Sequence, residues 1–178
     1  TVFGGIAGET MAKWVVDKPL LPCDMNAVMA SIEQHELPLR AVQGDIESVR
    51  DALADCMWNE VGISRNKESL LQARSRLDQL TAELHQIGVG GDSREFNLTW
   101  QDWMNLRNLI LVSRAINEAA LARENSRGSH YREDFPQSGD LESSYYTVAG
   151  LYQDQLKIEN RQVMFTRVQP GETILVEA

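Results

Sequence analysis

Residues 70–87 read LLQARSRLDQLTAELHQI, and this stretch decides the fold. Its apolar residues recur at an alternating spacing of three and four, which places them on one face of an α-helix. They are Leu70, Ala73, Leu77, Leu80, Leu84 and Ile87. We expect a long helix here with a continuous apolar stripe. Asn66 is its expected N-cap and Gly88 its C-terminal stop.

A similar helix is expected on either side of this stretch. The preceding one begins after Gly44, is capped by Asp45 and ends at Gly62. Its apolar positions are Ile46, Val49, Leu53, Cys56 and Met57. The following one opens at Thr99, where Thr99 and Asp102 approach the spacing of a capping box.

The third helix carries two apolar stripes, so we expect it to be the most buried of the three. One stripe is Leu106, Leu109, Val112, Ile116 and Ala120, and the other is Trp103, Met104, Leu111, Ala115 and Ala119. Short connections make neighbouring helices antiparallel. The predicted fold is therefore mainly α, an up-down-up three-helix bundle of the spectrin-repeat kind. An intermolecular coiled coil is the alternative, which three heptads and the two matching helices disfavour.

The flanks of this bundle differ from it in pattern. Residues 4–17 predict a short helical extension, and residues 26–36 a short helix that ends at Pro38. After Pro136, runs rich in β-branched and aromatic residues predict a small antiparallel β ribbon. Its expected strands are 145–149, 156–158 and 163–168, with a turn at 159–161. The expected domains are 1–22, 23–136 and 137–178.

Composition limits the classes of function. The 178 residues carry a net charge of −9, which argues against general binding to nucleic acid. No apolar run approaches the ~20 residues that span a bilayer, so we expect no direct membrane insertion. No signal peptide is evident, which favours the cytoplasm. Cys23 and Cys56 match no metal spacing, and Cys56 is expected to be a buried thiol.

The histidines give no catalytic pattern. His35, His85 and His130 lie far apart in the sequence, and His85 is expected to be exposed. No carboxylate stands at ligand spacing from them, so we predict neither a metal site nor a histidine-based triad. The pair Gly90 and Gly91 reads as a turn.

Residues 123–136, RENSRGSHYREDFP, concentrate cationic side chains in an otherwise acidic chain. A simple interpretation is that arginines at a helix end neutralise its last carbonyls. The order of residues, Ser-Arg-Gly-x-His-x-Arg-x-Asp-x-Pro, also resembles a signature of the flavoprotein subunits of succinate dehydrogenase and fumarate reductase. Asn125 and Ser129 depart from that signature, which has Glu and Ala there. L-aspartate oxidases carry a looser version.

Two further segments resemble the same family in the same order. Residues 57–65, MWNEVGISR, are similar to its Met-Trp-x-x-Val-Gly-Ile-x-Arg segment, and residues 2–8, VFGGIAG, to its Val-Phe-Gly-Arg-x-Ala-Gly segment. The resemblance implies a C-terminal helical domain of an FAD-dependent oxidoreductase acting on a small dicarboxylate. It also implies that the arginine of Val-Phe-Gly-Arg contacts a substrate carboxylate. The counterpart of that arginine is Gly5, which puts succinate or fumarate in question.

The chain begins inside a motif, without an initiator Met and without a Gly-x-Gly-x-x-Gly fingerprint, so we expect a piece of a larger protein. FAD is expected in the intact protein and not in this piece, which should be inactive. The expected partners are its own flavin domain and an iron–sulfur subunit, through which it would reach a membrane. An L-aspartate oxidase-like protein and a stand-alone helical interaction module are the alternatives.

The cationic segment is then expected to join the bundle to the flavin domain. Arg127 and Arg132 should therefore be exposed or solvent-satisfied when that domain is missing. No catalytic or metal-binding residue is predicted. The predicted interface residues are Arg65, Arg123, Ser126, Arg127, His130, Arg132 and Asp134.

Overall fold

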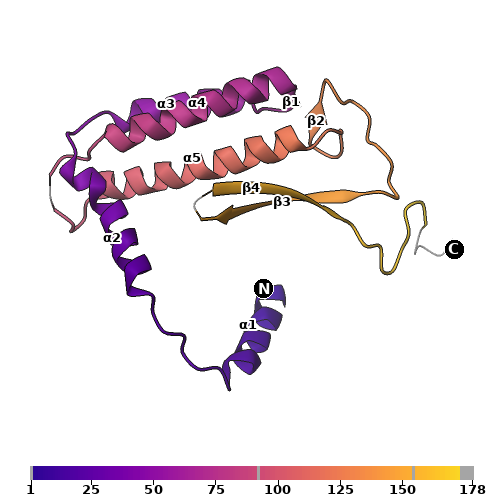
Figure 1. Ribbon diagram of the computed structural model, residues 1–178, viewed down its shortest axis with the longest axis horizontal. Coiled ribbons are helices and arrows are strands. Elements are labelled where there is room, and N and C mark those ends of the chain that lie inside the picture. Colours follow the sequence, from indigo (N-terminus) through magenta and orange to yellow (C-terminus); the bar gives the residue numbers. More distant parts are fainter. Residues whose placement is uncertain (1, 92, 154, 173–178) are drawn as a thin grey trace. The chain divides into compact units, whose positions relative to one another are not determined.

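The computed structural model describes residues 2–91, 93–153 and 155–172, and it divides into two compact units, 1–36 and 37–178. Within these residues five helices and two two-stranded sheets form (Figure 1). The helices are α1 (Val2–Val15), α2 (Met25–Arg40), α3 (Ile46–Asn59), α4 (Lys67–Gln86) and α5 (Leu98–Ala122). The strands are β1 (Ser64–Arg65), β2 (Tyr131–Arg132), β3 (Tyr145–Tyr152) and β4 (Gln155–Gln162). The prediction of a mainly helical chain ending in a small antiparallel sheet is confirmed.

The first unit contains α1 and most of α2. Asp24 begins α2, because its carboxylate accepts hydrogen bonds from the backbone N–H groups of Asn26 and Ala27. The expectation that Pro38 ends this helix is wrong, since α2 continues to Arg40. A proline in the last turn leaves few intrahelical bonds to lose. The Pro38 carbonyl also accepts the Val89 N–H at 3.0 Å, which supports that turn.

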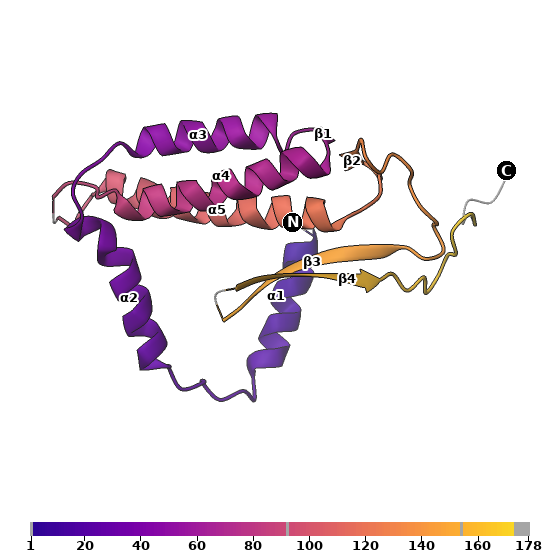
Figure 2. The same cartoon turned by 45° about the horizontal axis from the view of Figure 1, so that its top comes forward.

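In the second unit α3, α4 and α5 lie side by side (Figure 2), with α4 packed against both of the others. The predicted caps are confirmed for two of them. Asp45 accepts from the N–H groups of Glu47 and Ser48 at the start of α3. Asn66 forms a capping box with Ser69 at the start of α4. The cap predicted for α5 lies too far along the chain, because Asn97 accepts from Trp100 N–H and Thr99 lies inside the helix.

The apolar stripe of α4 forms the centre of the core. Leu70, Ala73, Leu77, Leu80 and Leu84 are at most 1% exposed. From α3 the core takes Ile46, Val49, Leu53 and Cys56, as predicted. As expected, α5 holds the most buried residues of the three helices, six against five in α4 and four in α3, but its predicted stripes are only partly right. Its buried side chains are Trp103, Leu106, Ile110, Ser113, Asn117 and Ala120, whereas Leu109, Val112 and Ile116 of the predicted stripe are about half exposed.

The C-terminal ribbon pairs β3 with β4 in antiparallel register, from Tyr145 opposite Gln162 to Tyr152 opposite Gln155. In both Figure 1 and Figure 2 it runs beside α5, and both of its strands contact that helix. Two details of the prediction are wrong. The chain reverses between Tyr152 and Gln155, so residues 159–161 lie within β4, and residues 163–168 are not a strand. The register places alternate side chains of each strand on one face, which fixes the pairing over all eight residues.

The turn after α4 passes very close to the backbone before α3. Gly88 N–H donates to Val42 at 2.7 Å, and the Gly88 carbonyl accepts from Gly44 N–H at 3.1 Å. A Cβ atom on Gly88 would lie 2.1 Å from the Ala41 carbonyl oxygen. Only glycine lets the two backbones approach this closely.

We therefore expect Gly88→Ala to lower the free energy of unfolding by about 1–3 kcal/mol, the usual cost of overpacking. Urea unfolding of the 178-residue chain measures it. Gly8→Ala is the matched control, because a Cβ there meets nothing within 4 Å in α1. A Gly88→Ala protein as stable as the Gly8→Ala protein would contradict the close approach.

Candidate functional site

The predicted site residues converge where α5 ends. Residues 123–136 turn back over the last turn of α5, and β2 pairs in parallel with β1, so that Ser64 lies opposite Tyr131 and Arg65 opposite Arg132. The pairing brings the start of α4 next to the end of α5 (Figure 1). Arg65 therefore joins the cationic segment although it lies nearly sixty residues earlier in the chain.

Arg132 lies inside this structure. Its side chain is 1% exposed, and it forms a two-pronged ion pair with Asp134, with Nε and Nη2 each 2.8 Å from a carboxylate oxygen. Nη1 donates to the carbonyls of Ala120, Leu121 and Arg123 at 2.9–3.3 Å. The guanidinium thus satisfies carbonyls at the C-terminus of α5 and faces the negative end of its dipole. The expectation that Arg132 is exposed or solvent-satisfied is wrong.

Asp134 and Ser126 complete the support of Arg132. The ion pair with Arg132 lowers the pKa of Asp134 to about 2, and Lys67 N–H, at the start of α4, donates to the same carboxylate. Ser126 Oγ accepts from Arg132 N–H at 2.9 Å and bonds the carbonyl of Phe135 at 2.8 Å. These three side chains bind the helix end, the segment after it and the start of α4 together.

Arg127 is also satisfied within the chain. Its guanidinium donates to the carbonyls of Ser138 and Asp140 and to the hydroxyl of Ser144, at 2.5–2.8 Å. It therefore holds the loop that leads from the cationic segment to β3. Its bonds are made to uncharged groups, because no carboxylate lies within ion-pair distance of it among the described residues.

Arg65 and His130 form a direct contact. Arg65 Nε donates to the carbonyls of Val61 and Gly62, and its Nη1 lies 3.0 Å from His130 Nδ1. Because the guanidinium can only donate, Nδ1 must accept, which places the imidazole proton on Nε2. Nε2 then donates to the carbonyl of Arg123 at 3.2 Å. Burial, together with the charges of Arg65, Arg123 and Arg132, lowers the pKa of His130 and keeps it neutral.

Arg123 borders the same space from the end of α5. Its Nε donates to Asn125 Oδ1 at 3.0 Å, and its guanidinium carbon lies 5.3 Å from the centre of the Tyr145 ring. An open pocket of about 540 Å³ lies among these groups. Its lining residues are Arg65, Ile116, Ala119, Ala120, Arg123, Arg127, Ser129, His130, Tyr146 and Thr147.

Four of the residues that line this pocket, Arg65, Arg123, Arg127 and His130, are among the predicted interface residues, and the residues from β3 are not. Tyr145, Tyr146 and Thr147 come from β3, and nothing in the spacing of residues tied that strand to α5. Glu133 was also missed. It accepts from Ser64 and Asn66 across the β1–β2 contact, which lowers its pKa. The signal for Glu133 is its place beside Arg132 in the motif.

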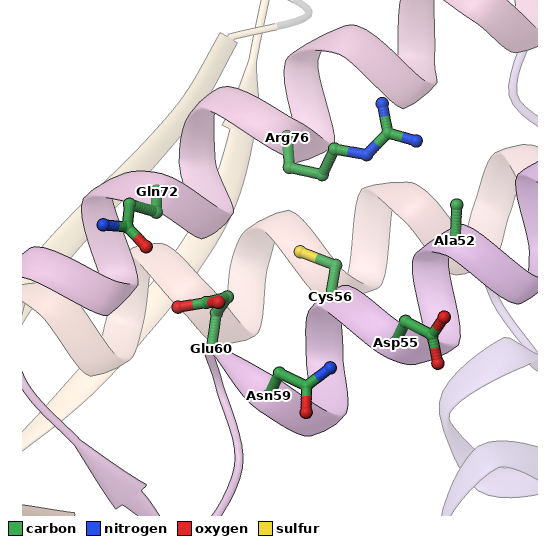
Figure 3. Close-up of a pocket in the computed structure, with 7 residues that line it drawn as sticks. All are labelled: Ala52, Asp55, Cys56, Asn59, Glu60, Gln72 and Arg76. Atoms are coloured by element: carbon green, nitrogen blue, oxygen red, sulfur yellow. The ribbon is translucent and has the colours of Figure 1, made fainter.

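A second pocket, of about 350 Å³, lies between α3 and α4 (Figure 3). Cys56 points into it, with Glu60 and Arg76 beside it. The thiol is 7% exposed, and burial, aided by Glu60, raises its pKa above the ordinary value, so it stays protonated. The expectation of a buried thiol is confirmed, and a protonated thiol is a poor nucleophile. We assign no chemistry to this pocket.

Among the described residues, no metal-ligand cluster and no glycine-rich dinucleotide-binding turn is found. No group of three or more His, Cys, Asp or Glu side chains there is placed to hold a metal ion. β1 leads directly into α4, as strands do in dinucleotide-binding folds, but the connection is Asn66, without the glycines that admit a pyrophosphate. This strand–helix turn does not fit FAD. No helix among the described residues is long and apolar enough to cross a membrane.

The half-buried His130 gives a pH dependence. The neutral form is favoured in the folded state, so the stability from the Arg65–His130–Arg123 contacts is present above the ordinary pKa of about 6.5. It should be lost as pH falls through the lowered pKa. We expect the urea midpoint of the 178-residue chain to fall between pH 7 and pH 5, and to fall less in His130→Asn.

Asp134 does not interfere in this window, because its stabilising charge is lost only as pH falls below 3.8 towards its pKa of about 2. His85→Asn is the control variant, since His85 is an exposed side chain on α4. An equal midpoint shift in the His130→Asn variant and in the unmodified chain would contradict the role of His130.

Known proteins resemble this chain over most of its length. The family model described as "Fumarate reductase flavoprotein C-term" matches residues 50–174. A polypeptide of the fumarate reductase (CoM/CoB) of Methanothermobacter marburgensis is 34% identical over 141 residues, which are 77% of this chain and 25% of that protein. L-aspartate oxidase of Pyrococcus abyssi is 39% identical over 93 residues, 52% of this chain and 14% of the oxidase.

The fold has solved counterparts as well. The Mycobacterium smegmatis Sdh1 complex contains a chain that matches with a TM-score of 0.77 and 28% identity, over 90% of this chain and 28% of that one. This chain therefore belongs to the family of C-terminal regions of succinate dehydrogenase and fumarate reductase flavoproteins, as the three sequence segments predicted. It spans about a quarter of the length of the curated relatives that it matches.

Proposed function

We propose that this chain is the C-terminal helical domain of an FAD-dependent oxidoreductase that exchanges hydride between flavin and a small dicarboxylate. The observation that carries the proposal is the family match over residues 50–174, with relatives named fumarate reductase. FAD would be bound by the part of the protein outside this chain, since the strand–helix turn at Asn66 does not fit it. Electrons would pass to an iron–sulfur subunit, in the cytoplasm or at a membrane held by further subunits.

The role of the chain itself would be structural. We propose that residues 1–22 end the flavin domain, that 23–136 form the helical domain, and that 137–178 are its extension. Helices α3, α4 and α5 would be an up-down-up bundle of the spectrin kind. The predicted interface would then divide in two. Ser126, Arg132 and Asp134 support the end of α5 and Arg127 holds the loop before β3, as their bonds within the chain support. Arg65, Arg123 and His130 border the open pocket, as Arg127 also does.

L-aspartate oxidase chemistry is the second candidate. The 39% identity to the Pyrococcus abyssi oxidase favours it. Gly5, where the resemblance places an arginine that contacts a dicarboxylate, puts succinate and fumarate in question but does not favour L-aspartate, which is also a dicarboxylate. Loss of a guanidinium removes a two-pronged, charge-assisted contact to a substrate carboxylate. A different substrate, or an arginine from elsewhere in the protein, would accommodate Gly5.

The test is purification of the full-length protein that contains this chain. We expect a yellow protein with a flavin spectrum, which reduces fumarate with a reduced dye or oxidises L-aspartate. The 178-residue chain alone should be colourless, inactive and unable to bind FAD in calorimetry. A full-length protein without flavin would overturn the proposed function. Micromolar affinity of the 178-residue chain for FAD would overturn the assignment of FAD to the rest of the protein.

A further inference from the structure

The pocket at the end of α5 has an unusual charge for this chain. Three of its ten lining residues are arginines, and none is acidic, although the chain carries 26 acidic and 17 basic residues. Glu133, which directly follows β2, accepts from Ser64 and Asn66. The pocket therefore presents positive charge to whatever enters it.

Two of these arginines are oriented but not paired. Arg65 and Arg123 each use Nε to bond groups of the chain, and Arg65 uses Nη1 for His130. Among the described residues, neither has a carboxylate within ion-pair distance, and no acceptor is found for Nη2 of Arg65 or for either Nη of Arg123. Six other arginines do pair with carboxylates, namely Arg50, Arg74, Arg76, Arg114, Arg132 and Arg161. Guanidinium groups fixed in this way suit a carboxylate.

The surroundings of the pocket indicate the kind of molecule that brings the carboxylate. Leu109, Val112 and Ile116 are 51%, 53% and 45% exposed and follow one another at helical spacing along α5. Ile116 also lines the pocket, so the apolar stripe continues into it. A small free anion would leave this apolar stripe exposed to water. A protein segment, by contrast, can cover the stripe and place an acidic side chain in the pocket.

We propose that the pocket receives the carboxylate of an aspartate or glutamate from the part of the same polypeptide outside residues 1–178. Arg65 and Arg123 bind it together, and His130 is a positioning residue that orients Arg65. Relatives about three times as long supply the length of chain for such a contact. The inference rests on the proposed function, because it takes the rest of the polypeptide to be the flavin-binding part.

The experiment uses the full-length protein with its FAD. Hydrogen exchange of the peptides covering residues 109–123 is compared in the unmodified protein, in Arg65→Gln/Arg123→Gln and in Arg114→Gln. Arg114 is the matched control because it lies on α5 but pairs with Asp78 at the surface. We expect exchange to become about tenfold faster in the double variant, as the covering segment dissociates more often, and to change less than about twofold in the control. His130→Asn should give a smaller increase of the same pattern.

The outcomes separate the two proposals. A flavin-containing protein in which the double variant exchanges like Arg114→Gln overturns the carboxylate contact and leaves the proposed function standing. A full-length protein without flavin overturns the proposed function, and with it the inference that rests on it. A free anion is tested by adding inorganic phosphate or succinate to the full-length protein. If either slows exchange of residues 109–123 tenfold in the unmodified protein and not in the double variant, the pocket binds free anions, and the contact with the rest of the polypeptide is wrong.

Discussion

Arg132→Gln should lower the free energy of unfolding of the 178-residue chain by about 1–3 kcal/mol, the usual loss when buried polar groups, here carbonyls at the end of α5, are left without a partner. The guanidinium is 1% exposed and serves two purposes at once. It pairs with both oxygens of Asp134, and it satisfies carbonyls of the last turn of α5. Glutamine is too short to reach both sets of acceptors, so buried carbonyls and a carboxylate would lose their partners.

Urea unfolding followed by circular dichroism measures this loss. Arg161→Gln is the control, because Arg161 pairs with Glu159 on the ribbon with both side chains about half exposed, and should cost less than about 1 kcal/mol. Arg132→Lys should recover only part of the loss, since an ammonium cannot bond two carboxylate oxygens and the carbonyls in one plane. If Arg132→Gln costs no more than Arg161→Gln, the bonds to the α5 carbonyls do not hold in solution.

The helices of the second unit were largely predictable because their signals are local. A three–four spacing identifies the buried face of α4, and Asp45 and Asn66 mark the starts of α3 and α4 through bonds to backbone only two or three residues away. Such signals depend on neighbours in sequence alone. They hold whatever the helix later packs against.

The buried face of α5 was not predictable in the same way, because two polar contacts to α4 select it. The Trp103 indole N–H donates to the carbonyls of Leu84 and Ile87, and the Asn117 amide donates to the carbonyl of Leu70 at 3.0 Å. Trp103 and Asn117 are fourteen residues apart, so they lie on one face of the helix. Apolar periodicity included Trp103, Leu106 and Ala120, which are buried. It also favoured Leu109, Val112 and Ile116, which the structure leaves half exposed.

At the candidate site, too, the sequence does not reveal contacts between residues far apart in the chain. The motif in residues 123–136 predicts a cationic cluster, but its arginines have different roles that depend on long-range contacts. Arg132 meets the end of α5 and is buried, Arg127 bonds the loop before β3, and Arg65 reaches His130 through the β1–β2 pairing. A sequence pattern records that cations recur. It does not record which of them find carboxylates within the chain.

Leu77→Ala should lower the free energy of unfolding by about 2–5 kcal/mol. Leu77 is 0% exposed at the middle of α4, between the buried faces of α3 and α5. Truncation removes buried methyl groups and leaves a cavity, and two helices on either side limit how far the core can collapse into it. Alanine is also the better helix former, so the loss cannot come from helix propensity.

Leu71→Ala makes the same chemical change one residue from Leu70 in the same helix, where the side chain is 41% exposed. It should cost less than about 1 kcal/mol, because most surface changes stay small. The difference between the two variants isolates burial from every effect of replacing leucine with alanine in α4. A Leu77→Ala protein that loses under about half a kcal/mol would mean that this stripe faces solvent, and the packing of α4 between α3 and α5 would then be wrong.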